Sequence, residues 1–231
     1  MVIVAYGPTG ARFAGDDGGI VVGMTAADFV PEGADLDGLR RAAAGCRGCE
    51  LWEPATQTVF SAGSPTARLA LVGEQPGDQE DRQGVPFVGP AGRLLQKAVD
   101  EAGISRADTY VSNAVKHFRF TQAGPGKRRM HQTPDRLHIE ACKPWLVAEL
   151  RVVDPDVVVA LGATATRALL GPAVKVTKDR GVLIERETSL GMRRFLVTIH
   201  PSAVLRMPDQ ARQEAYDALV ADLRVAASAL G

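Results

Sequence analysis

Four short segments of the chain are predominantly apolar instead of alternating between apolar and polar residues. They are ARLALVGE (67–74), TYVSNAVK (109–116), PDVVVALG (155–162) and RFLVTIH (194–200). β-Branched residues are frequent in these runs, as is typical of strands that are covered on both faces. The pattern therefore predicts four buried parallel strands.

Between and after these runs, apolar residues recur at helical spacing in segments 94–102, 137–152, 163–170 and 215–226. Pro144 falls inside the second segment and predicts a kink or a restart of that helix. Strands that alternate with helices indicate an α/β fold. We expect a three-layer α/β/α domain with a central four-stranded, mainly parallel sheet.

The N-terminal segment differs in character from the rest. Residues 1–33 are glycine-rich and lack a sustained period, so we expect an irregular extension there and one domain over 34–231. Met24 begins a stretch that is typical of a native start. Residues 1–23 are therefore a candidate for an over-long start and stay outside the functional argument.

Composition excludes few classes of protein. The chain has 231 residues, of which 45% are hydrophobic, and its formal net charge is zero. No apolar run approaches the roughly 20 residues of a membrane span, and no signal peptide is visible, so we expect a cytoplasmic protein without membrane contact. Because no global charge attracts nucleic acid, a nucleic-acid surface needs local clustering of cations. The segment from Lys116 to Lys143 provides it, with Lys116, Arg119, Lys127, Arg128, Arg129, Arg136 and Lys143.

Polar residues follow three of the predicted strands directly. Glu74 ends the first run, Asn113 and His117 lie at the end of the second, and His200 ends the fourth. Ligands of such sheets bind beyond the carboxyl ends of the strands. The sequence therefore predicts that these side chains meet at one rim.

The loops at this rim allow more than one interpretation. GEQPGDQED (73–81) carries four carboxylates, which would repel phosphate; it is either a solvated acidic loop or places Glu74 to polarise a nucleophile. Phe87, in GVPFVGPAG (84–92), either packs in a satellite core or stacks on a base. His200 precedes Pro201 and Ser202, and a lone histidine after a strand is more often structural than catalytic.

Three cysteines and one basic pentapeptide complete the candidates. Cys46 and Cys49 form a C-x-x-C pair and Cys142 stands apart, and this odd number argues against disulfides. The pair suits a metal or cluster site; a redox site is the weaker alternative, because no βαβ unit precedes it. KRRMH (127–131) lies among glycines and prolines. On its charge alone it is a solvated basic loop with an incidental histidine.

Taken in order, GEQPGDQED, GVPFVGPAGRLL, SNAVKHF and HPS resemble the motifs of the uracil-DNA glycosylase superfamily, specifically its iron–sulfur branch. KRRMH is similar to the insertion loop of the UdgX type, whose usual form is KRRIH. Met130 is the single departure and is a conservative apolar exchange. The resemblance covers the chain from Cys46 to the C-terminus.

The resemblance implies a role for each candidate. Asn113 would recognise the Watson–Crick edge of uracil, Phe87 would stack on the flipped base, and His200 would stabilise negative charge on uracil O2. Gln75 and Asp78 would shape the base-binding loop. Lys127, Arg128 and Arg129 would contact DNA phosphates.

The resemblance also implies a [4Fe–4S] cluster held by Cys46, Cys49, His117 and Cys142, with His117 where other iron–sulfur glycosylases carry cysteine. The role of the cluster would be structural. A structural zinc ion in a Cys3His site fits the same ligand types, and a Cys142 that is merely buried in its helix is a further alternative.

For the UdgX type, the resemblance implies that His131 captures C1′ of the deoxyribose after uracil leaves, so that the protein stays covalently attached and acts once. Glu74 would accept the other imidazole N–H or orient a water. The expected partner is uracil-containing DNA, preferably single-stranded, bound by a monomer. One alternative is an iron–sulfur glycosylase that turns over, and another is a non-catalytic module that binds DNA damage.

Overall fold

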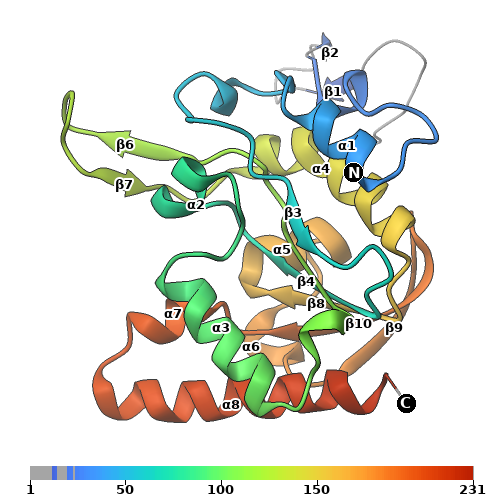
Figure 1. The fold of residues 1–231 in the computed structure, drawn as a ribbon, viewed down its shortest axis with the longest axis vertical. Coiled ribbons are helices and arrows are strands. Elements are labelled where there is room, and N and C mark those ends of the chain that lie inside the picture. The colour runs from blue at the N-terminus through green and yellow to red at the C-terminus, as the bar shows by residue number, and fades with distance from the viewer. Residues whose placement is uncertain (1–11, 15–19, 23, 231) are drawn as a thin grey trace.

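The computed structural model describes residues 12–14, 20–22 and 24–230 of the chain (Figure 1). A mixed sheet of six strands forms the centre, in the order β3-β5-β4-β8-β10-β9. Its strands are β3 (Ser61–Gly63), β4 (Leu69–Gly73), β5 (Thr109–Asn113), β8 (Val157–Leu161), β9 (Leu183–Thr188) and β10 (Gly191–Thr198).

The four predicted strands are confirmed as the parallel centre of this sheet, β5-β4-β8-β10. The predicted number of four was too small, because β3 and β9 add an antiparallel strand at each edge. Both edge strands are short or partly exposed, and β9 (LIERET) carries three charged residues. Neither has the apolar run by which the inner strands were found.

Helices cover both faces of the sheet, as the α/β/α prediction requires. One face packs Ala70 and Val72 against α1 (Leu36–Ala43), α4 (Arg136–Val153) and α5 (Gly162–Leu170). The other packs Leu69 and Leu71 against α3 (Pro90–Glu101) and α8 (Asp209–Ser228). Successive residues of β4 thus enter opposite cores, which explains why a buried strand is apolar at every position. The remaining helices are η1 (Ala26–Asp28), η2 (Glu50–Trp52), α2 (Asp78–Gln83), η3 (Arg106–Asp108), α6 (Val176–Asp179) and α7 (Pro201–Leu205).

The long helix α4 continues through Pro144, so the structure shows no restart there. None of the described helices is long and apolar enough to cross a membrane.

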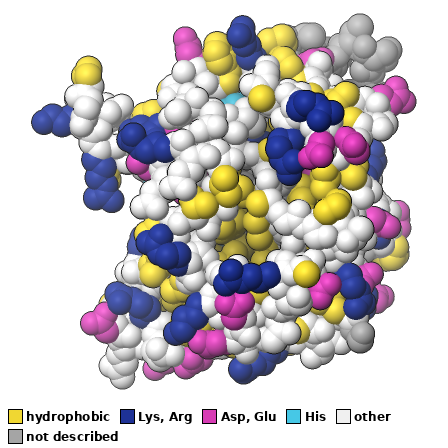
Figure 2. All heavy atoms as spheres, in the orientation of Figure 1, with side chains coloured by type: hydrophobic (Ala, Val, Ile, Leu, Met, Phe, Trp, Pro, Cys, Tyr) yellow, Lys and Arg dark blue, Asp and Glu magenta, His cyan; other side chains and the backbone are white. Residues whose placement is uncertain are grey.

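A separate two-stranded sheet holds the last three residues of the basic pentapeptide. β6 (Phe120–Gln122) pairs antiparallel with β7 (Arg129–His131), and residues 123–128 connect them. The prediction of a basic loop was therefore wrong for its second half, because Arg129–His131 is a strand. Figure 2 shows this hairpin projecting from the upper left of the molecule with Lys and Arg side chains on it.

The predicted N-terminal extension is described only in part. Residues 1–11, 15–19 and 23 lie outside the described residues, and β1 (Arg12–Ala14) pairs with β2 (Ile20–Val22). Ala26 of η1 is 1% exposed and belongs to the core beside α4. The boundary at residue 34 between extension and domain remains a prediction.

Candidate active site

The carboxyl ends of three parallel strands bring the candidate residues to one rim. Glu74 follows β4, Asn113 ends β5, and His200 follows β10. The register of β4 and β5 pairs Gly73 with Asn113, and the N–H of Ala114 donates to the Gly73 carbonyl at 2.9 Å. The ends of β4 and β5 are therefore level.

Glu74 is held between two partners. The hydroxyl of Thr164, at the start of α5, donates to Oε2, and Oε1 lies 3.3 Å from Nε2 of His131. Burial raises the pKa of the Glu74 carboxyl, but the contacts with His131 and Thr164 outweigh it, and the pKa lies below its ordinary value. Glu74 is thus an anion at neutral pH, beside the imidazole of the pentapeptide.

His131 reaches Glu74 from the hairpin. It is the last residue of β7 and pairs with Phe120 of β6. Its side chain is 46% exposed, and its ring lies 6.0 Å from that of Phe118. The imidazole is therefore supported on one side by an aromatic ring and still open to an incoming molecule.

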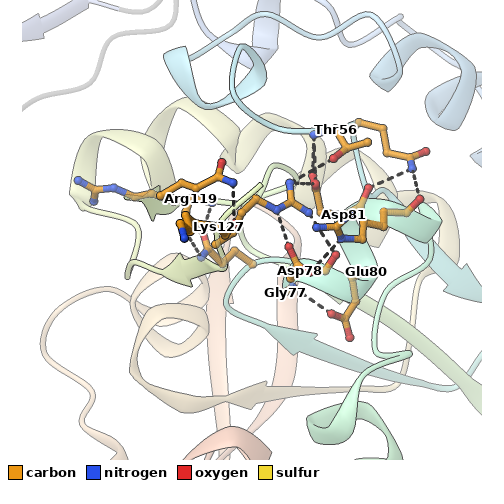
Figure 3. A network of polar contacts seen from close by, with 12 residues as sticks. Thr56, Gly77, Asp78, Glu80, Asp81, Arg119 and Lys127 are labelled. Carbon is orange, nitrogen blue, oxygen red and sulfur yellow. Dashed lines mark hydrogen bonds and ion pairs between the residues drawn. The ribbon is translucent and has the colours of Figure 1, made fainter. Parts of the chain in front are cut away.

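Arg129 anchors the hairpin to the body of the protein through Asp78 and Asp81 of α2, which are labelled in Figure 3. Its guanidinium pairs with Asp78 through Nε and with Asp81 through Nη1, and the Nη1–Asp81 distance is 2.6 Å. It also lies over the rings of Phe118 and Phe120. The side chain is only 8% exposed. This differs from the predicted phosphate contact, because the guanidinium is already neutralised by two carboxylates.

Gln75 makes a second attachment of the hairpin. Its amide nitrogen donates to the carbonyls of Arg119 and Gln132, at 3.1 and 3.0 Å, and its amide oxygen accepts from the N–H of Arg119. The side chain thus joins the end of β4 to both arms of the hairpin. Gln75 and Asp78 shape the rim by fixing the strand that carries His131.

The carboxylates of the acidic loop have separate tasks. Only Glu74 faces the histidine; Asp78 and Asp81 hold Arg129. Glu80 accepts the N–H of Gly89 at 2.7 Å and of Gly77 at 3.2 Å, which ties the loop of Phe87 to α2. The interpretation of a merely solvated acidic loop is therefore wrong, since Glu80 and Asp81 are buried.

Phe87 and Asn113 approach each other over the end of β4. A Cβ atom added to Gly73 would lie 2.6 Å from the Phe87 ring and 2.5 Å from Oδ1 of Asn113. Glycine at position 73 therefore keeps room for both. Phe87 has a φ of 57°, an uncommon conformation for a bulky residue and one that recurs at functional sites.

Asn113 is 2% exposed. Within the described part of the chain, no hydrogen bond to its side-chain amide is found. An amide at the end of a buried strand with a free donor and a free acceptor can recognise a complementary edge of a ligand.

His200 is fixed as a neutral hydrogen-bond donor. The N–H of Ser202 donates to Nδ1 at 3.1 Å, so Nδ1 is an acceptor and the proton of the neutral ring is on Nε2. Burial lowers the pKa of His200 to about 4, although Glu74 acts in the opposite direction. The ring lies 6.4 Å from that of Phe87, with 29° between their planes.

Comparison with known proteins agrees with this geometry. The sequence model of the uracil DNA glycosylase superfamily matches residues 60–224, most of the chain. The chain belongs to the uracil DNA glycosylase superfamily. It is 40% identical to the Type-4 uracil-DNA glycosylase of Thermotoga maritima over 162 residues, which is 70% of this chain and 78% of that protein.

Two archaeal members of the superfamily are also similar. The Type-4 uracil-DNA glycosylase of Archaeoglobus fulgidus is 33% identical over 183 residues, or 78% of this chain and 87% of that protein. That of Pyrobaculum aerophilum is 33% identical over 178 residues, or 75% of this chain and 86% of that protein. The superfamily match includes every rim residue described above and begins after the C-x-x-C pair.

The predicted cluster ligands lie at the side of this superfamily domain, where α4 meets the segment after α1. Cys46 Sγ accepts the indole N–H of Trp145 at 3.2 Å, and Cys142 Sγ accepts the N–H of Lys116 at 3.3 Å. Burial raises the pKa of Cys49 to about 11 and that of Cys142 to about 12. A metal group bound here would displace the thiol protons, because thiolates are the ligands.

His117 is oriented as a ligand would be. The hydroxyl of Thr58 donates to the carbonyl of Ala43, so it accepts the Nε2–H of His117, 2.9 Å away. The lone pair of the neutral ring is then on Nδ1. Histidine ligands usually donate their other N–H in this manner. The donor set therefore fits a metal group.

The donor types fit both groups that the sequence allowed. Three cysteines and one histidine can hold a zinc ion in a Cys3His site or a [4Fe–4S] cluster.

Thr164 and His138 contribute to the sites although the sequence did not indicate them. Thr164 orients Glu74, and an isolated threonine in a helix gives no signal. His138, to which no role was assigned, is 3% exposed and lies 2.6 Å from Glu50, next to Cys49. It also caps α4 with Asp135. Asp135 is a typical N-cap residue and was a signal in the sequence, whereas histidine three residues later is not part of the usual capping pattern.

Proposed function

We propose that this protein excises uracil from DNA and that His131 then forms a bond to C1′ of the deoxyribose. The observation that supports the second step is the 3.3 Å separation between His131 Nε2 and the Glu74 carboxylate, at a rim that also holds Phe87, Asn113 and His200. All of these residues come from one chain, so a monomer suffices.

Recognition of the base rests on two side chains. The free amide of Asn113 matches the alternating donors and acceptors of the uracil edge, and Phe87 offers its ring to the flipped base. A base already unpaired costs less to extrude, which favours single-stranded DNA. Lys127 and Arg128, both exposed at the hairpin tip, contact the phosphates.

Cleavage of the glycosidic bond moves its electron pair onto uracil and leaves a cationic sugar. The Nε2–H of neutral His200 donates to O2 of the departing uracil, where the negative charge develops. The anionic Glu74 stabilises the positive charge on the sugar.

Capture by His131 closes the reaction. A lone pair of the imidazole forms the new bond to C1′, and the carboxylate of Glu74 takes up the proton of the other ring nitrogen. The product is an N-glycoside of histidine, which resists hydrolysis as the N-glycosides of DNA do. One molecule of protein is then consumed for each uracil.

We infer that Cys46, Cys49, His117 and Cys142 hold a [4Fe–4S] cluster. When bound, it supplies structure and no electron transfer, because uracil release involves no change of oxidation state. It would fasten α4, which follows the hairpin, to the segment after α1.

A denaturing gel with labelled single-stranded DNA tests the proposal. DNA with one uracil should give a shifted band that survives heat and detergent, whereas the same DNA with thymine and the variant His131→Ala should give none. Free uracil in molar excess over protein, without the band, would instead establish a glycosylase that turns over, as the Type-4 names of the relatives favour. Binding without any base release would refute both forms.

A further inference from the structure

The turn that follows β5 joins two sites within five residues. Asn113 ends the strand at the proposed uracil pocket, and His117 is a proposed cluster ligand. Between them, Lys116 is 0% exposed, so its ammonium group lies in the interior of the protein. Lysine is almost never fully buried unless it is paired.

All three protons of the ammonium group have acceptors. Nζ lies 2.5 Å from Oε1 of Glu149, 2.6 Å from Oγ of Ser112 and 2.9 Å from the carbonyl oxygen of Asn113. An ammonium group has three donors, so its hydrogen-bonding capacity is fully used. One of the three bonds holds the main chain of the residue that faces the base.

The charge is balanced from α4. Glu149 is also 0% exposed and accepts from the hydroxyls of Ser112 and Tyr110, at 2.6 and 2.9 Å. A buried ion pair is weak evidence for stability, since apolar residues of similar volume are often as stable. An apolar side chain at position 116 could not donate to the Asn113 carbonyl.

The main chain of Lys116 faces the other way, toward the cluster site. Its N–H donates to Sγ of Cys142 at 3.3 Å, and its carbonyl accepts the N–H of Val59 at 2.9 Å. The ammonium end therefore fixes the turn at Asn113, and the peptide end fixes it at a proposed ligand.

We propose that Lys116 is a positioning residue for uracil recognition: its ammonium group fixes the Asn113 carbonyl, and so the side-chain amide, against helix α4. The inference rests on the proposed function, because it concerns how the same pocket distinguishes uracil. Selectivity for uracil would then depend on the ammonium group of Lys116, which lies outside the pocket.

Two variants separate positioning from stability. Glu149→Gln leaves the Lys116 amine able to donate to Asn113 but removes its counter-charge. Lys116→Met/Glu149→Gln removes the donor and leaves no unpaired charge. The measurement is the ratio of affinities for single-stranded DNA with one 2′-fluoro-2′-deoxyuridine, which resists cleavage, and the same DNA with thymidine. Thermal unfolding and the visible absorbance of the cluster are recorded for each protein.

The double variant should unfold at the same or a higher temperature than Glu149→Gln, and yet its affinity ratio should be lower on the order of tenfold. Glu149→Gln should keep a ratio close to that of the wild type. Cluster absorbance should persist in both, because Cys142 is contacted by the main chain of Lys116.

The inference would be overturned if the affinity ratio fell in proportion to the unfolding temperature across the variants. It would also be overturned if the double variant kept the wild-type affinity ratio. Should Glu149→Gln yield no folded protein, the double variant is compared with the wild type, and an unchanged ratio again refutes it. A wild type that neither prefers nor excises uracil marks a failure of the proposed function instead.

Discussion

Replacing Arg129 by alanine should detach the hairpin that carries His131. The change leaves Asp81, whose side chain is 0% exposed, without its cation. Breaking a buried pair costs about 3–5 kcal/mol. Asp81 retains the N–H of Thr56, at 3.0 and 3.1 Å from its two oxygens, which favours the lower end of that range. Loss of the stacking on Phe118 and Phe120 adds about 0.5–1 kcal/mol for each ring. We expect the free energy of unfolding to fall by about 4 kcal/mol.

Urea unfolding measures this change, and the denaturing gel measures the covalent product, which should be lost because His131 is no longer held beside Glu74. Arg128→Ala is the matched control, since its side chain is the neighbouring cation and is exposed. It should change the free energy of unfolding by less than about 0.5 kcal/mol. Its effect should instead be a salt dependence of DNA binding that is weaker by about one phosphate contact.

If Arg129→Ala had nearly wild-type stability and a reduced salt dependence of DNA binding, its guanidinium would be a DNA ligand, as the resemblance implied, and not an anchor of the hairpin. Arg129→Met/Asp81→Asn provides a further check. Because the two residues share a contact, its loss of stability should be smaller than the sum of the single losses.

Three other outcomes follow from the same contacts. Glu74→Gln should slow formation of the covalent product on the order of a hundredfold in single-turnover kinetics, because the amide cannot take up the imidazole proton. Burial lowers the pKa of His200 from its ordinary value of 6.5 to about 4, so the unfolded chain binds more protons than the folded protein between these pH values. The free energy of unfolding should therefore fall as the pH drops from about 6.5 to about 4, and it should fall less steeply in His200→Asn. Met130→Ile should alter neither stability beyond about 0.5 kcal/mol nor the covalent yield, since Met130 is 52% exposed.

The sequence predicts the centre of this fold well for a physical reason. Strands buried on both faces are rich in apolar residues, and each of the four was recognised by such a run, although β5 also carries Ser112 and Asn113. Their shared direction places Glu74, Asn113 and His200 at one edge, so the rim follows from the sheet. The edge strands β3 and β9 have one partner each and a less apolar sequence, and the periodicity of the chain contains little to indicate them.

The direction of side chains in the basic segment was not predictable in the same way. Lys127, Arg128 and Arg129 are equivalent as a run of charges, and the partners of Arg129, Asp78 and Asp81, are about fifty residues away in the chain. Only the pairing of β6 with β7 decides which cation turns inward. Asp135 illustrates the opposite case, since an N-cap aspartate directly before a helix is a local pattern.

The alternating direction of side chains along β7 decides which residues of KRRMH face the body of the protein. Side chains two residues apart on a strand point to the same face. Arg129 and His131 therefore both point toward the body of the protein, where Arg129 pairs with Asp78 and Asp81 and His131 lies beside Glu74. Met130 points away from the body. A shift of one residue in the register with β6 would exchange these faces and remove the histidine from Glu74. The ion pairs of Arg129 thus fix the register of the hairpin as well as the distance between His131 and Glu74.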